Sequence, residues 1–100
     1  MNMNKETLRQ FARNKVMVVI KNASQEKELK HISKTNNVIM CAIQPNVEDK
    51  IFPKYYSIVD MMTSDRIVLI PDLNREELID IGWVEMEYKT FKRQSKREKI

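Results

Sequence analysis

Glycine, histidine and cysteine are each present only once in this 100-residue chain. With Gly82 as the only glycine, the chain has no glycine-rich loop to hold phosphates, which excludes a P-loop and a dinucleotide-binding fingerprint. His31 and Cys41 cannot by themselves build a zinc site of the usual kinds, and a catalytic triad would have to use His31. We therefore expect no metal, no cofactor and no enzymatic activity, with His31 on the surface and Cys41 in the core.

Long apolar runs are also lacking. The longest, residues 38–43, has six residues, whereas a membrane-spanning helix needs about 20. The first 15 residues are polar and contain no apolar stretch of the kind found in secretory signals. A single cysteine cannot form an internal disulfide, so we expect a cytoplasmic protein without a membrane span. The abundance of Lys, Ile and Asn is typical of an AT-rich genome, bacterial or phage.

The charged residues are divided among three blocks. Residues 1–34 carry a net charge of +5, residues 35–88 carry −6 and residues 89–100 carry +5, which gives +4 for the chain. Charge segregated in this way affects partners and encounter rates rather than the fold. In the acidic block, four residues are predicted to form a docking patch for a protein with a basic surface: Glu76, Asp80, Glu85 and Glu87. The alternative is a solvated acidic face.

Two basic segments are candidates for nucleic-acid binding. The tail carries Lys89, Lys92, Arg93, Lys96, Arg97 and Lys99, which would contact phosphates without sequence preference. The segment 50–56 interleaves basic and aromatic residues, a pattern that can stack bases while neutralising the backbone; its candidates are Lys50, Phe52, Lys54 and Tyr55. The alternatives are a solvated tail, and aromatic side chains that pack in the core.

The order of elements is predicted from hydrophobic periodicity. Residues 5–13 have apolar positions at helical spacing, and the continuous apolar runs 16–20 and 38–43 are typical of strands buried on both faces. Between them, Ser24 is predicted to cap a helix over residues 25–34 that stops at Asn36 and Asn37. Strand, helix and strand of this length are typical of a βαβ unit with parallel strands.

The second half repeats this pattern. Apolar residues at positions 55, 58, 59 and 62 predict a helix, and residues 67–70 predict a buried strand. Asn74 and Glu77 form the pattern of a capping box for the next helix, which Gly82 ends in a left-handed conformation. Residues 84–88 alternate between apolar and polar, as in a half-exposed edge strand.

These elements predict a small, single-domain, three-layer α/β fold in the order αβαβαβαβ. Its four-stranded sheet would be mostly parallel, with the last strand as an antiparallel edge. The domain would span residues 1–91, followed by a basic tail, 92–100, that is either frayed or a polar helical extension.

Ligands of open α/β sheets bind beyond the carboxyl ends of the strands. In this chain those ends present a cluster of polar candidates: Asn22, Ser24, Gln44, Asn46, Asp72 and Asn74. Capping helices and closing turns is the alternative role for these residues, Asp72 included. The pattern therefore predicts where a ligand would bind better than it predicts the chemistry.

Three hypotheses about function follow. The first is a small non-enzymatic regulatory or adaptor protein that binds another protein, with the edge strand from residue 84 to 91 open to strand addition or to a second copy. The alternative is a nucleic-acid-associated protein that uses the basic tail and the 50–56 segment. The third is an enzyme that relies on Asp72 and the polar strand ends.

Overall fold

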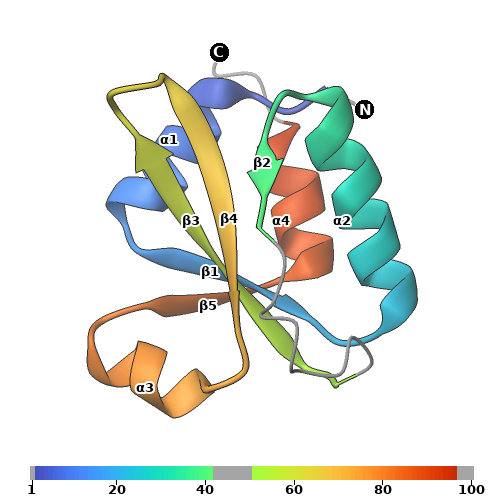
Figure 1. The fold of residues 1–100 in the computed structure, drawn as a ribbon, viewed down its shortest axis with the longest axis vertical. Coiled ribbons are helices and arrows are strands. Elements are labelled where there is room, and N and C mark those ends of the chain that lie inside the picture. The colour runs from blue at the N-terminus through green and yellow to red at the C-terminus, as the bar shows by residue number, and fades with distance from the viewer. Residues whose placement is uncertain (1, 42–50, 97–100) are drawn as a thin grey trace.

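The computed structural model describes residues 2–41 and 51–96. In this part of the chain four helices and five strands form a compact α/β domain (Figure 1). In chain order they are α1 (Lys5–Arg13), β1 (Val16–Ile20), α2 (Ala23–Thr35), β2 (Ile39–Met40), β3 (Lys54–Met61), β4 (Arg66–Asp72), α3 (Arg75–Asp80), β5 (Val84–Glu87) and α4 (Tyr88–Ser95). The α/β class predicted from the sequence is confirmed.

The sheet is mixed and has five strands in the order β2-β4-β3-β1-β5. β1 pairs in parallel with β5, and β2 in parallel with β4, whereas β3 is antiparallel to both of its neighbours, β1 and β4. Four strands therefore run in one direction and β3 runs in the other. The predicted four-stranded sheet is wrong in its strand count, and β5, although an edge strand, is parallel to its neighbour.

The helix predicted over residues 55–62 is the source of this error, because these residues form β3. Tyr56 and Ile58 lie in one core, and Tyr55 lies in another on the opposite face of the sheet. Both faces of the first part of β3 are thus apolar, which hides the alternation that marks a strand in the sequence. Four apolar residues at helical spacing occur here by coincidence, in a segment whose aromatic and β-branched residues favour a strand.

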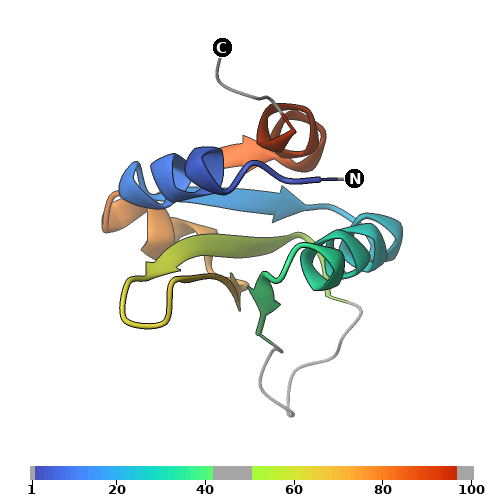
Figure 2. The same cartoon turned by 90° about the horizontal axis from the view of Figure 1, so that it is seen from above.

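Helices lie on both sides of the sheet, but unequally. The larger core joins the sheet to α1, α2 and α4 through Leu8, Leu29 and Phe91, which are at most 2% exposed. Figure 2 shows α1 and α4 together on one side of β1, where the rings of Phe11 and Phe91 have centroids 6.2 Å apart. On the other side, the six-residue helix α3 supplies Leu78 to a small second core. The third layer is therefore one short helix.

Local signals place most helix ends correctly. Asn4 and Asn74 cap α1 and α3 by accepting from the backbone N–H three residues later. Asn36 ends α2, and Asn37 has a positive φ of 58°. The cap of α2 is Asn22 rather than Ser24, because the helix begins at Ala23, two residues earlier than the sequence indicates.

The C-terminal part of the described chain is helical, as in one of the two alternatives predicted for the tail. β5 ends at Glu87, and α4 follows at once and continues to Ser95. Phe91 is 1% exposed and Ser95 is fully buried, so residues 92–95 pack against the domain. The expected boundary between residues 91 and 92 falls inside α4. Of the strand predicted over residues 38–43, the structure shows β2, and residues 42 and 43 lie outside the described residues.

In residues 2–41 and 51–96, no helix is both long enough and apolar enough to cross a membrane.

Candidate functional site: an open apolar face of the sheet

One face of the sheet is apolar but not covered by a helix over much of its area. Side chains alternate along each strand, and Ile67 and Leu69 of β4 point into the larger core. Residues 68 and 70 therefore point away from it, to the opposite face. The register pairs Val68 with Val59 of β3 and with Ile39 of β2, so these residues share that face. We call it the open face: Ile39, Val59, Met61, Val68 and Ile70.

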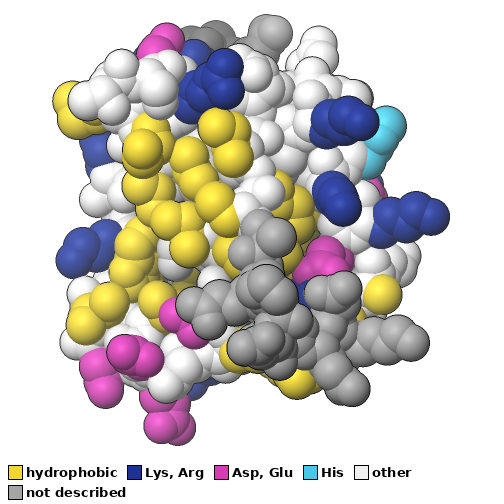
Figure 3. Space-filling view, viewed as in Figure 1, with side chains coloured by type: hydrophobic (Ala, Val, Ile, Leu, Met, Phe, Trp, Pro, Cys, Tyr) yellow, Lys and Arg dark blue, Asp and Glu magenta, His cyan; other side chains and the backbone are white. Residues whose placement is uncertain are grey.

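Most of the open face is exposed, although Val68, which pairs with both Val59 and Ile39, is only 8% exposed. Ile39 is 40% exposed, and Met61 and Ile70 are each 44% exposed, whereas Ile67 and Leu69 on the opposite side of β4 are 2% and 1% exposed. Met62, in the turn after β3, is 86% exposed. Figure 3 shows hydrophobic side chains gathered over β3 and β4 on this side of the molecule. A cluster of large exposed aliphatic side chains on one face is typical of an interaction surface.

α3 covers only one end of this side of the sheet. Leu78 of α3 packs with Met17, Val19 and Tyr55, and Trp83 lies against them. α3 also leaves apolar side chains in solvent, since Ile79 is 38% and Ile81 59% exposed. The uncovered end is the one that carries Met61, near the turn between β3 and β4 (Figure 1).

Charged residues stand at the two ends of the open face. Arg66 and Asp72 are the first and last residues of β4 and share the face of Val68 and Ile70 by alternation. Arg66 is exposed, and Asp72 is half-buried beside α3. Acidic side chains of the predicted docking patch, Glu76 and Asp80, are exposed on α3, and Figure 3 shows acidic groups gathered over that helix.

The rest of the predicted acidic patch is divided. Glu85 of β5 forms an ion pair with Arg75 of α3, and Glu87 forms one with Lys21, with 3.2 Å between Nζ and Oε1. These two carboxylates are paired within the domain, whereas Glu76 and Asp80 of α3 form no ion pair within the part of the chain that the structure describes.

The predicted strand-end cluster lies along one edge, but its members have structural roles. Asn22 accepts a hydrogen bond from the backbone N–H of Gln25 at 2.9 Å, and Ser24 lies exposed in the first turn of α2. Asp72 accepts one from the backbone N–H of Asn74 at 2.8 Å, and Asn74 caps α3. β3 lies between β1 and β4, which keeps Asn22 apart from Asp72. Gln44 and Asn46 lie outside the described residues.

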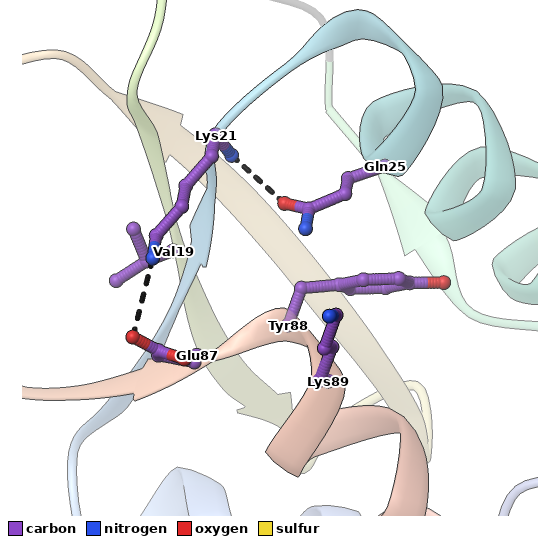
Figure 4. Close-up of a pocket in the computed structure, with 6 residues that line it drawn as sticks. All are labelled: Val19, Lys21, Gln25, Glu87, Tyr88 and Lys89. Carbon is purple, nitrogen blue, oxygen red and sulfur yellow. Dashed lines mark hydrogen bonds and ion pairs between the residues drawn. The ribbon is translucent and has the colours of Figure 1, made fainter.

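A small pocket of about 160 Å³ does lie at the carboxyl ends of the parallel strands β1 and β5 (Figure 4). Its lining residues are Val19, Lys21, Gln25, Glu87, Tyr88 and Lys89. The ion pair between Lys21 and Glu87 spans one side, and the backbone N–H of Lys21 donates to Oε1 of Gln25 at 2.9 Å. Its charged groups are thus largely paired with each other, and a Glu87 carboxylate in the wall disfavours anions.

In the predicted base-stacking segment 50–56, Lys54, Tyr55 and Tyr56 are buried, whereas Phe52 is half-buried. The Lys54 side chain is 3% exposed, and its Nζ lies 2.7 Å from Oε2 of Glu26 and 4.6 Å from the ring centroid of Phe52. The Tyr56 hydroxyl donates to the same Glu26 oxygen at 2.8 Å. Tyr55, 7% exposed, belongs to the second core. Lys54 and Tyr55 are therefore not available to a nucleic acid, and Lys50 lies outside the described residues.

Three basic residues of α4 and its C-terminal cap are exposed, in contrast to Lys54. Lys89, Arg93 and Lys96 are exposed and follow one another at helical spacing. Lys92 instead forms an ion pair with Glu28 of α2, and its hydrogen bond lowers the pKa of that carboxyl below the ordinary value. Arg97 and Lys99 lie outside the described residues.

The single histidine lies on α2, and the single cysteine directly follows β2. His31 is exposed on α2, and Cys41 is a half-buried free thiol whose backbone N–H donates to the Leu69 carbonyl at 2.9 Å. Within residues 2–41 and 51–96, no three His, Cys, Asp or Glu side chains are grouped so as to hold a metal ion.

No family model matches the chain. No curated protein and no solved structure matches it either. Its function is therefore inferred from the geometry and charge of its own surface, where the open face is the feature that packing within the domain does not account for. The sequence does not reveal this face, because its residues come from β2, β3 and β4, and the apolar spacing in β3 is typical of a helix.

Proposed function

We propose that this is a small, non-enzymatic regulatory or adaptor protein that binds another protein through the open face. The observation that carries the proposal is the exposure of Ile39, Met61 and Ile70 together on one face of the sheet. Burying apolar surface contributes roughly 25 cal/mol for each Å², so covering these side chains favours association. The proposal assigns no catalytic residue and retains the cytoplasmic setting expected from the sequence.

Replacing Ile70 with Glu tests the proposal, because it places a charge in the middle of the open face. We expect Ile70→Glu to lose the proteins that the wild-type chain captures from extracts of its native cell, measured by quantitative mass spectrometry. The matched control is Val84→Glu on β5. Val84 is 56% exposed, but it pairs with Val16, which points into the larger core. Val84 therefore lies on the opposite face of the sheet from Ile70.

Equal thermal unfolding of both variants would show that the charge affects binding rather than folding. Full capture of every partner by folded Ile70→Glu would overturn the proposal. Loss of partners from Val84→Glu alone would move the binding surface to the edge strand.

A second candidate function is nucleic-acid binding by α4. It is favoured by the exposed row Lys89, Arg93 and Lys96. Phosphate contacts of this kind weaken steeply between about 50 and 200 mM salt. Fluorescence anisotropy with labelled oligonucleotides should show that reversing these three charges abolishes binding, whereas reversing three exposed lysines of α2, Lys27, Lys30 and Lys34, does not. Equal loss in both variants would indicate a non-specific effect of net charge.

A further inference from the structure

The open face has opposite charges at its two ends. Arg66 is the first residue of β4 and Asp72 is the last. Val68 and Ile70 lie between them on the same face. Six residue steps along a strand place these ends about 20 Å apart. Arg66 forms no ion pair with any described residue, and the exposed carboxylates of α3, Glu76 and Asp80, add to the negative end.

The open face is also covered unequally along its length. α3 lies over the end near Asp72 and buries Tyr55 and Met17 against Leu78. Nothing in the described chain covers the end near Arg66, where Met61 and Met62 are 44% and 86% exposed. The surface is therefore stepped, with a raised acidic end at α3 and a bare end at the β3–β4 turn, where Arg66 follows Asp65, whose carboxylate is paired with Lys5 and Arg9.

We propose that a second copy of this chain occupies the open face, related to the first by a two-fold axis that lies across the strands. The inference rests on the proposed function and names the partner. This rotation places the Arg66 end of each copy against the Asp72 end of the other. It also brings α3 of each copy over the bare end of the other, so that Ile79 and Ile81 approach Met61 and Met62.

A two-fold interface is made by the same patch on both copies and must be complementary to itself. The open face meets this condition in three respects: its middle is apolar, its ends have opposite charge, and its raised end matches its bare end. A partner with a uniformly basic surface would attract the acidic end of the open face but would repel Arg66 at the other end. A specific dimer needs about 800 Å² from each copy, which is about an eighth of the 6792 Å² surface of the chain.

Analytical ultracentrifugation of the full chain from about 1 to about 100 µM, at low salt, tests the inference. We expect the wild type to sediment as a dimer and Ile70→Glu as a monomer, with Val84→Glu still dimeric. Arg66→Glu should weaken the dimer at least tenfold, and adding Asp72→Arg to the same chain should restore it, because the swapped charges again face each other in a two-fold pair.

Asp72 also accepts the hydrogen bond of the Asn74 N–H, so its substitution needs its own control. Asp72→Asn keeps the accepting oxygen and removes the charge. It should fold like the wild type, as circular dichroism would show, and weaken the dimer without abolishing it.

The two proposals fail in different ways. If the folded wild type stays monomeric at the highest concentration, the proposal that a second copy occupies the open face is overturned. If Ile70→Glu nevertheless loses a captured protein, the proposed function stands. A dimer that survives Ile70→Glu but not Val84→Glu assigns dimerisation to the β5 edge and overturns the inference. A dimer that resists both, with unchanged capture, overturns both proposals.

Discussion

Tyr88 begins α4 with its side chain buried in the larger core, where it is 4% exposed. Its hydroxyl makes no hydrogen bond of ordinary geometry with the described residues, although the Glu28 carboxylate of α2 lies close to it. Burial, together with the nearby Glu28 carboxylate, raises the pKa of Tyr88 well above its ordinary value of 10.0. An unfolded tyrosine ionises near pH 10 while the buried one stays neutral, so the folded state loses stability as pH rises above that value.

Tyr88→Phe is therefore expected to be more stable than the wild type by about 1 kcal/mol at neutral pH, because it removes a buried polar group that makes no hydrogen bond of ordinary geometry. Above pH 10 the advantage should grow, since phenylalanine cannot ionise. Urea unfolding at both pH values measures it. Tyr56→Phe is the matched control: its hydroxyl donates to Glu26, so the same change should destabilise by about 1 kcal/mol. A Tyr88→Phe variant less stable than the wild type would show that the hydroxyl is bonded.

The sequence gives no indication that Lys54 is buried. A basic residue between aromatic residues is equally typical of a nucleic-acid surface and of a strand. Lys54 can be buried because its ammonium group pairs with Glu26. Glu26 lies 28 residues earlier in the first turn of α2, and only the packing of α2 against the sheet brings it to Lys54. Burial of a charge requires a partner of this kind, and pairs between distant elements cannot be deduced from local spacing.

At the scale of elements, α3 depends on the residues at its two ends. Asn74 caps its first turn, and Gly82 has a φ of +100° just after its last turn. The chain then enters β5 through Trp83, which packs in the second core with Leu78. Both ends were predicted correctly because capping and left-handed residues act within a few positions of the chain.

Gly82→Ala is expected to destabilise the domain by about 1–2 kcal/mol, since a residue with a side chain is strained at this φ. An added Cβ would meet Lys15 Nζ at 3.7 Å and Cδ at 3.8 Å, which is ordinary contact, so the backbone alone accounts for the loss. Urea unfolding measures it. Gly82→Asn should lose less, because asparagine tolerates the left-handed region better. Equal losses in the two variants would point to crowding against Lys15.

β3 shows where prediction by element fails. The four strands predicted from the sequence all run in one direction in the structure, including β5, which was expected to be antiparallel. Inserting β3 between β1 and β4 with opposite direction makes the sheet mixed. Helical spacing over eight residues was a weaker signal than the aromatic and β-branched composition of this segment.

For the whole molecule, the sequence predicts the class of fold but not the open face. Ile39, Met61 and Ile70 are apolar and give no sign in the sequence of being exposed. Their exposure follows from the shortness of α3, which is too small to cover the sheet, and from the position of β3 beside β4.

If the open face joins two copies, unfolding and dissociation are coupled, and the melting temperature depends on protein concentration. A hundredfold increase in concentration should raise the melting temperature of the wild type by about 5 to 10 °C, as followed by circular dichroism. The melting temperature of Ile70→Glu should not change. A wild type whose melting temperature is independent of concentration would be unfolding as a monomer.

The pairing of β1 with β5 has a consequence for how the chain acquires its structure. Val16 faces Val84, 68 residues later, and the backbone N–H of Asn4 donates to the Ser95 carbonyl at 2.6 Å. Contacts between such distant segments slow folding, because a large loop must close before they form. During synthesis, β1 emerges from the ribosome before β5. The edge of β1 that pairs with β5 therefore stays unpaired until β5 and α4 have been made. Completion of the native fold therefore requires the residues of β5 and α4.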